Sequence, residues 1–130
     1  MKATMLSLTL ASVLTGSLAS QAPACKFSLS VEPDAVAFYL ATDTMPAFGA
    51  VIVSFAPDLT HYFVGLPPLL TDFAVLSVTA MEGPELNLLL PATAFPRGVF
   101  VYAQGLIGAA NGIAASRVAA FVLDAGPPGQ

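Results

Sequence analysis

The stretch CKFSLSV, residues 25–31, alternates strictly between apolar side chains and polar ones. Phe27, Leu29 and Val31 fall on one side of an extended chain, while a lysine and two serines fall on the other. A period of two residues is typical of a β-strand with one buried face. Glu32-Pro33-Asp34 then ends the strand, because proline lacks the amide donor that a continuing ladder needs. This stretch predicts that the chain folds into sheets.

Further strand-like segments follow, separated by turn residues at intervals of roughly 8–12 residues. Residues 42–48 and 91–98 contain prolines and no periodicity, so they are predicted loops. Short strands without any long amphipathic segment predict an all-β fold, an immunoglobulin-like antiparallel β-sandwich of seven to eight short strands. The segment at residues 35–41 is rich in alanine, so it is also compatible with a helix. The remaining predicted strands are 35–41, 49–55, 60–64, 73–81, 85–90, 99–107 and 116–123.

The last two strands are predicted to form a hairpin through residues 108–112, GAANG. Asparagine and glycine accept the positive φ that tight connections between antiparallel strands need. Residues 98–116 carry no charge and nearly reach the length of a membrane-spanning helix. Gln104, Gly105 and further glycines would weaken such a helix at its centre, so the hairpin is favoured over a membrane span.

The N-terminus has the features of a secretory signal peptide. Lys2 supplies a positive charge, residues 5–14 are apolar, and Ser17-Leu18-Ala19 places small residues where signal peptidase reads them. We therefore predict a helical signal peptide at residues 1–19 and a linker at 20–24. The β-sandwich domain then spans residues 25–124 and a flexible tail 125–130. The mature protein is predicted to be secreted, or to reside in the periplasm or at the cell surface.

Two alternatives to cleavage after Ala19 stay open. The apolar stretch could be an uncleaved anchor, but it is shorter than the about 20 residues that span a bilayer. Ala22-Pro23-Ala24-Cys25 could be a lipoprotein cleavage site with Cys25 acylated, although proline at that place is atypical. Cys25 is the single cysteine, so no internal disulfide is available. This usage favours an exported bacterial protein over a disulfide-rich secreted module.

The composition limits the partners. Charged residues make up 9% of the 130 residues and hydrophobic residues 56%, against roughly 25% charged in an average protein. Removal of the signal would leave three basic residues against eight acidic ones, a net charge of −5. Lys26, Arg97 and Arg117 are too few and too far apart for a phosphate-binding stripe, which excludes nucleic acid. The same scarcity argues against anionic lipid surfaces.

The C-terminal third resembles an uncharacterised module found at the C-terminus of many secreted bacterial proteins. The matching features are Leu90-Pro91, Gly98, Tyr102-Ala103-Gln104 and Ser116, across about residues 86–123. Arg117 departs from the pattern, because the family often has asparagine there. The resemblance implies a β-sandwich and export, and it implies no activity.

Gln104 and Tyr102 are two residues apart and so share one face of a strand. A buried glutamine needs partners for its amide, and backbone groups of a neighbouring loop can supply them. We predict that Gln104 clamps the loop at residues 91–97. The alternative is that its amide contacts a ligand.

No catalytic, cofactor-binding or metal-binding residue is predicted. His61 is the only histidine and Cys25 the only thiol, so neither a nucleophilic triad nor a zinc site can be assembled. The carboxylates at turns are interpreted as caps and solubilising groups, with calcium binding or glycoside hydrolysis as alternatives. The amphipathic rings of Tyr39, Tyr62 and Tyr102 are the candidates for carbohydrate contacts. The carboxylates concerned are Asp34, Asp43, Asp58, Asp72, Glu82, Glu85 and Asp124.

These observations predict a secreted, non-enzymatic β-sandwich without a cofactor, acting as a structural or adhesion-type interaction module. Its scarce charge leaves apolar surface for a protein partner or for self-association. No membrane span is expected after removal of the signal. The alternative is an extracellular carbohydrate- or calcium-binding module that uses turn carboxylates and tyrosines.

Overall fold

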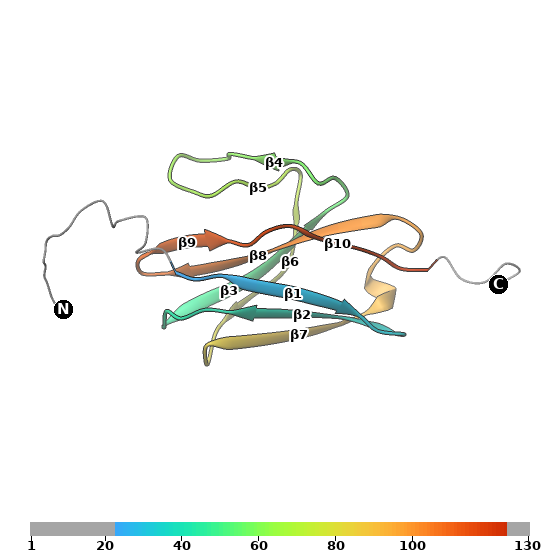
Figure 1. Ribbon diagram of the computed structural model, residues 1–130, viewed down its shortest axis with the longest axis horizontal. Helices are drawn as coiled ribbons and strands as arrows, with labels where there is room; N and C mark the ends of the chain where they lie inside the picture. The colour runs from blue at the N-terminus through green and yellow to red at the C-terminus, as the bar shows by residue number, and fades with distance from the viewer. Residues whose placement is uncertain (1–22, 125–130) are drawn as a thin grey trace, which may run out of the picture.

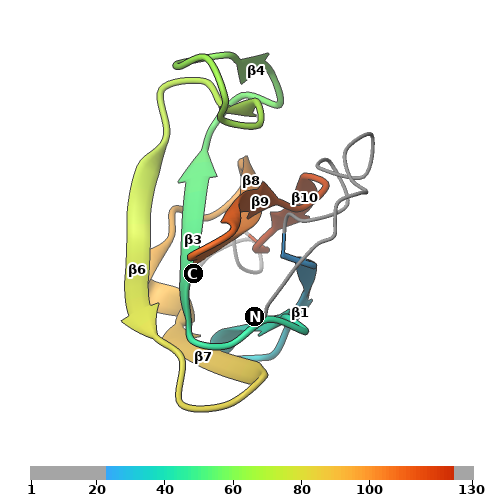
Figure 2. The ribbon, with the colours of Figure 1, turned by 90° about the vertical axis from the view of Figure 1, so that its left-hand side faces the viewer.

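The computed structural model describes residues 23–124, which form two antiparallel β-sheets packed face to face (Figures 1 and 2). The three-stranded sheet contains, in order, β1 (Lys26–Val31), β2 (Ala35–Ala41) and β7 (Glu85–Pro91). The five-stranded sheet contains, in order, β10 (Ala119–Val122), β8 (Phe100–Ala109), β3 (Ala47–Ser54) and β6 (Ala74–Ala80), and β9 (Gly112–Ala115) also pairs with β8.

The strand order is immunoglobulin-like. The chain forms the β1–β2 hairpin, crosses to the other sheet for β3 and β6, returns for β7, and crosses again for β8 to β10. The prediction of an all-β antiparallel sandwich is confirmed, and the two sheets contain eight strands within residues 23–124 when β9 and β10 are counted separately. The predicted signal helix at 1–19, most of the linker at 20–24 and the tail at 125–130 lie outside the described residues.

The core lies between the sheets and follows the alternation seen in the sequence. Phe27, Leu29 and Val31 of β1 stand opposite Leu40, Phe38 and Val36 of β2, on the side of the sheet that faces the core. Val31, at the end of β1, remains 46% exposed, whereas the other five join the core cluster, where Val51, Val101 and Ile107 of the five-stranded sheet pack against them. Four phenylalanines extend the cluster through stacked and edge-to-face contacts, which favour aromatic cores. These are Phe27, Phe38, Phe95 and Phe121.

A small two-stranded arm, β4 (Leu59–Thr60) and β5 (Leu69–Leu70), stands at the top of the molecule in Figures 1 and 2. The prediction of an aromatic strand at 60–64 is wrong here, because residues 61–66 form a loop and turn instead of a ladder. The pairing strand β5 was not predicted. Two residues between prolines and a turn show no periodicity, so nothing in the local sequence marks them.

The predicted C-terminal hairpin forms, but with a tighter connection. In the pairing of β8 with β9, Leu106 lies opposite Ala115 and Ala109 lies opposite Gly112. Only Ala110 and Asn111 remain as the turn. Gly112 has a φ of 133°, the region that favours glycine. Of the predicted strand 116–123 only Ala119–Val122 forms a strand, β10, which pairs with β8, while the strand that follows the turn, β9 at Gly112–Ala115, lies outside the predicted strand.

The uncharged stretch 98–116 thus contains the strands β8 and β9 joined by a turn. Within residues 23–124 no helix is long and apolar enough to cross a bilayer. The loop predicted at 91–98 contains a single 3-10 turn, η2 (Ala92–Ala94), whose Ala92 joins the core.

Candidate functional site

The surface of most interest is the side of the five-stranded sheet that faces away from the core. Residues opposite each other on paired strands point to the same side of a sheet, so the strand registers identify this side. None of its residues carries a charge. We call it the outer face; its residues are Phe48, Ala50, Ile52, Ser54, Val75, Val78, Ala80, Phe100, Tyr102, Gln104, Leu106, Gly108, Ile113, Ala115, Ala120 and Val122.

Much of the outer face is open to solvent. Phe48 is 59% exposed, Val78 64% and Phe100 58%. Together with Phe55, which follows β3 and lines the same hollow as Phe100, the exposed phenylalanines present about 370 Å² of surface, taking roughly 200 Å² for each residue. Phe55 and Phe100 share one hollow and Phe48 borders another, so this area is divided between the two ends of the face. The exposed valines and Ile113 add to it.

The opposite surface of the molecule is different. On the three-stranded sheet, Ser28, Tyr39 and Asn87 face outward in one row, and Lys26 and Glu85 flank Ala41 in another. This side thus carries hydroxyl, amide and charged groups. Leu89 is an exposed large hydrophobic residue on this side, so the contrast is that the three-stranded sheet mixes polar and apolar groups whereas the outer face is uncharged throughout.

The arm divides the outer face into two parts. Its Leu69 and Leu70 pack on Ile52, with Tyr102, Leu106 and Val118 around them. One apolar hollow of about 440 Å³ remains beside Phe48, Ala80 and Ile113. A second, of about 570 Å³, remains beside Phe55, Phe100 and Tyr102. The arm therefore buries the centre of the face and leaves an apolar hollow at each end.

Gln104 holds the arm in place. Its side-chain oxygen accepts a hydrogen bond from the Leu70 amide at 3.1 Å, and its nitrogen donates to the carbonyls of Pro68 at 3.2 Å and Ser116 at 3.1 Å. Gln104 is thus a clamp, but the predicted loop was wrong. The Gln104 side chain bonds residues 68–70 and Ser116, and not the loop at residues 91–97. The 91–97 loop lies on the core side of the sheet, where Phe95 packs against Phe121, whereas Gln104 points to the outer face. The ligand-contact alternative lacks access, because Gln104 is only 2% exposed.

Ser116 forms hydrogen bonds that replace the strand pairing missing between β9 and β10. Its hydroxyl accepts a hydrogen bond from the Gly105 amide at 2.9 Å and donates to the Arg117 carbonyl at 2.7 Å. Its own amide donates to the Gly105 carbonyl at 2.9 Å. The sequence pattern singled out this serine without a reason, and the structure supplies one: the side chain replaces a missing ladder partner.

The three tyrosines do not form a platform. Tyr39 lies on the outer side of the three-stranded sheet, and Tyr102 stacks on Phe100 on the other sheet. Tyr62 belongs to the arm, where its hydroxyl donates to the Leu70 carbonyl and accepts from the Asp72 amide. Loss of solvent, and then the nearby Glu85 carboxylate, raise the pKa of Tyr39.

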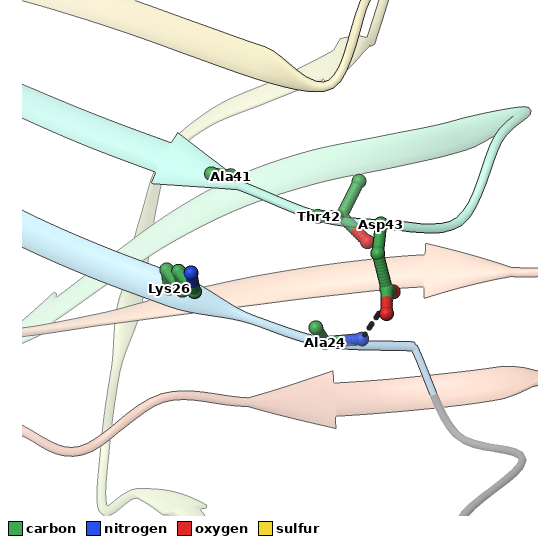
Figure 3. Close-up of a pocket in the computed structure, with 5 residues that line it drawn as sticks. All are labelled: Ala24, Lys26, Ala41, Thr42 and Asp43. Carbon is green, nitrogen blue, oxygen red and sulfur yellow. Dashed lines mark hydrogen bonds between the residues drawn. The ribbon is translucent and has the colours of Figure 1, made fainter.

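The carboxylates are also dispersed. Among residues 23–124 there is no group of three or more His, Cys, Asp or Glu side chains that could hold a metal ion. Asp43 lines a small hollow together with Lys26 and Thr42, and its carboxylate is held by hydrogen bonds within the protein (Figure 3). It accepts hydrogen bonds from the Ala24 amide and then the Thr44 hydroxyl, and these lower its pKa. His61 is exposed in the arm loop.

Cys25 faces inward immediately before β1. Its Sγ donates to the Gly105 carbonyl at 3.4 Å, and its side chain packs against the core. Burial raises the pKa of this thiol from 9.0 to about 11. Thiols in such surroundings are poor nucleophiles, since the thiolate is the reactive species.

We expect Cys25 to resist alkylation at pH 8 in the folded protein, reacting about 100-fold more slowly than in denaturant because the thiolate is scarcer by that factor. Between pH 9 and about 11 the unfolded chain releases this proton and the folded chain keeps it. The free energy of unfolding should therefore fall as pH rises through that window. Iodoacetamide kinetics and urea titrations measure both effects, with Cys25→Ala as the control for the pH slope.

Two outcomes would contradict this description of Cys25. Equal alkylation rates in buffer and in denaturant would show that the thiol is open to solvent. A thiol that stays unreactive in denaturant would be covalently modified, as the lipoprotein alternative requires.

The geometry therefore offers one extended surface and no constellation of reactive groups within residues 23–124. Comparison with protein-family models, with curated proteins and with solved structures finds no match for this chain.

Proposed function

We propose that this chain is a secreted, non-enzymatic β-sandwich that acts as a structural or adhesion-type interaction module, and that the outer face is its binding surface. The observation that carries the proposal is the apolar, uncharged character of that face in a chain with a net charge of −4. Exposed apolar surface that gathers on one face of a molecule marks sites of protein interaction. The resemblance of residues 86–123 to a module of secreted bacterial proteins supports export and adds no activity.

The arrangement of the face suits a protein partner better than a small ligand. Aromatic residues are enriched and charged residues are depleted at protein interfaces. Phe48 and Phe100 lie at the two ends of the face, and each borders a hollow that an apolar partner side chain could fill. Such aromatic anchors in pockets account for most of the binding energy at interfaces.

A matched pair of substitutions tests the proposal. Phe48→Glu adds a charge to the outer face, and Leu89→Glu adds the same charge to an equally exposed hydrophobic residue, 67% against 59%, on the other sheet. We expect a photo-crosslinking residue at position 48, but not at position 89, to capture a protein in the producing cells. Phe48→Glu should then weaken binding to that purified protein at least about tenfold, which corresponds to about 1.4 kcal/mol.

Adducts from both positions, or from neither, would contradict the assignment of the outer face. A carbohydrate-binding module is the second candidate, because Ser28, Tyr39 and Asn87 line a hollow of about 180 Å³ on the polar side. Hydroxyl and amide groups beside an aromatic ring are suited to sugars. A glycan that raises the melting temperature of the parent protein but not of Tyr39→Ala would favour this candidate instead.

A further inference from the structure

A cavity of about 250 Å³ lies where β3 ends and β6 begins, on the side of the five-stranded sheet that faces the core. β6 is the edge strand of this sheet (Figure 2). The cavity is bounded by β3, β6, β8 and the chain at and just after η2. Only Ser54 and Asp72 among its lining residues are polar. It is thus an apolar cavity, distinct from the two hollows of the outer face.

A β-bulge in β6 builds one wall of the cavity. Val51 pairs with Ser77 and Ile52 pairs with Val75, so Leu76 between them has no partner on β3. A bulge changes the direction of the side chain that it carries. Leu76 packs against the core cluster and lines the cavity. The extra residue therefore supplies an apolar wall on the core side of an edge strand.

The floor of the cavity is part of the rigid core. Val101 is 2% exposed. The Phe95 ring makes an edge-to-face contact with Phe121, with 5.2 Å between the ring centroids, and lies 6.3 Å from the Phe38 ring. Sites for small molecules are concave, mostly apolar and largely formed before the ligand arrives. The packing of these rings keeps the cavity formed, so a ligand would not have to order its walls.

One polar group at the cavity is uncommitted. The Ser54 hydroxyl donates to the Thr71 carbonyl at 2.7 Å and accepts from the Ala56 amide at 3.3 Å. The Asp72 amide donates to the Tyr62 hydroxyl at 3.0 Å, which ties the backbone of Asp72 to the arm. Its carboxylate has no hydrogen bond or ion pair with any other described residue. The polar group left for a ligand is therefore an anion that only accepts hydrogen bonds.

We propose that this cavity binds a small organic amine, whose apolar ring lies against Phe95 and Leu76 and whose ammonium group donates to Asp72. Asp72 is the only charged residue that lines the cavity, and the net charge of −4 also favours a cation. A cavity of about 150 Å³ with aliphatic and aromatic walls holds benzene. A volume of about 250 Å³ leaves room for a ring with a short aminoalkyl chain. This site is independent of the proposed function of the outer face.

Titration of the purified protein with phenethylamine, followed by amide NMR spectra, tests the proposal. Phenethyl alcohol and hydrocinnamate have the same ring and carry a neutral and an anionic group. We expect the amine to bind saturably and to shift the amides that surround Leu76 and Phe95. Its dissociation constant should be about threefold lower than that of the alcohol, the size expected for a partly exposed ion pair. Salt at about 1 M should remove most of this preference.

Variants separate the charge from the cavity. Asp72→Asn removes the charge and keeps a residue that tolerates the φ of 52° at this position, so the preference for the amine over the alcohol should disappear. Asp58→Asn removes an equal charge outside the cavity and should preserve the preference. Ala74→Leu adds an isobutyl group at the exposed mouth and should weaken binding of the amine and of the alcohol at least about tenfold.

Several outcomes would overturn the amine site. These are the absence of saturable binding, shifts centred elsewhere, equal affinity for the three compounds, or an Asp72→Asn protein that still prefers the amine. Tighter binding of an acetylated lysine amide than of phenethylamine would assign the cavity to a lysine side chain of a protein partner instead. Crosslinking from position 48 does not involve this cavity, so it tests the proposed function separately.

Discussion

Replacing Gly105 with alanine should destabilise the protein by about 2–3 kcal/mol, the upper part of the range for overpacking a core. A Cβ at this position would lie 2.6 Å from Cδ2 of Leu40 and 2.8 Å from Cδ1 of the Phe27 ring. Gly105 points inward from β8, and both neighbours come from the opposite sheet. Leu40 is 1% exposed, so it has no open space into which it can withdraw. The two sheets approach each other more closely here than a methyl group allows.

Urea unfolding measures this loss, and Gly108→Ala on the same strand is the control. A Cβ at Gly108 would meet only Cγ1 of Ile113 at 3.9 Å, which is ordinary contact. That variant should remain within about 0.5 kcal/mol of the parent protein. Equal stability of the two alanine variants would mean that the sheets separate at Gly105 without cost, and the described packing would be wrong.

Gln104→Ala should destabilise the protein by about 3 kcal/mol and release the arm from the outer face. The substitution leaves the Leu70 amide and the carbonyls of Pro68 and Ser116 without their partner. A buried polar group without a partner costs about 1–3 kcal/mol. For a domain of this size the melting temperature should fall by about 4–8 °C for each kcal/mol lost.

Thermal unfolding and hydrogen exchange test this prediction together. Asn87→Ala removes an exposed amide from β7 and should change the stability by less than about 0.5 kcal/mol. In Gln104→Ala the Leu70 amide should lose its protection while the amides of β1 and β2 keep theirs. An unchanged melting curve, or an arm that stays protected, would show that hydrophobic packing on Ile52 alone holds the arm.

The strands that could be predicted are those whose two sides differ. β2 forms over 35–41 as predicted, and β1 lies within the predicted strand at 25–31, because water on one side and the core on the other impose a period of two. The arm could not be predicted in this way. Its pairing residues Leu69 and Leu70 are held by Gln104, which is 34 residues further along the chain, and such a contact leaves no local pattern.

The candidate site was only partly visible in the sequence. Scarce charge indicated that apolar surface would remain, but it gave no location. β3 and β8 are apolar on both sides, and a strand of that kind does not reveal which side meets the core. The identity of the outer face follows from the register of five strands and from the polar residues on the opposite sheet.

Residue order alone thus determined the class of fold, since hydrophobic alternation and turn chemistry act between neighbours in the chain. Tertiary structure alone decided where Gln104 binds, why Gly105 has no side chain, and which apolar surface stays open. Each of these depends on groups that are distant in sequence and meet only when the two sheets and the arm assemble.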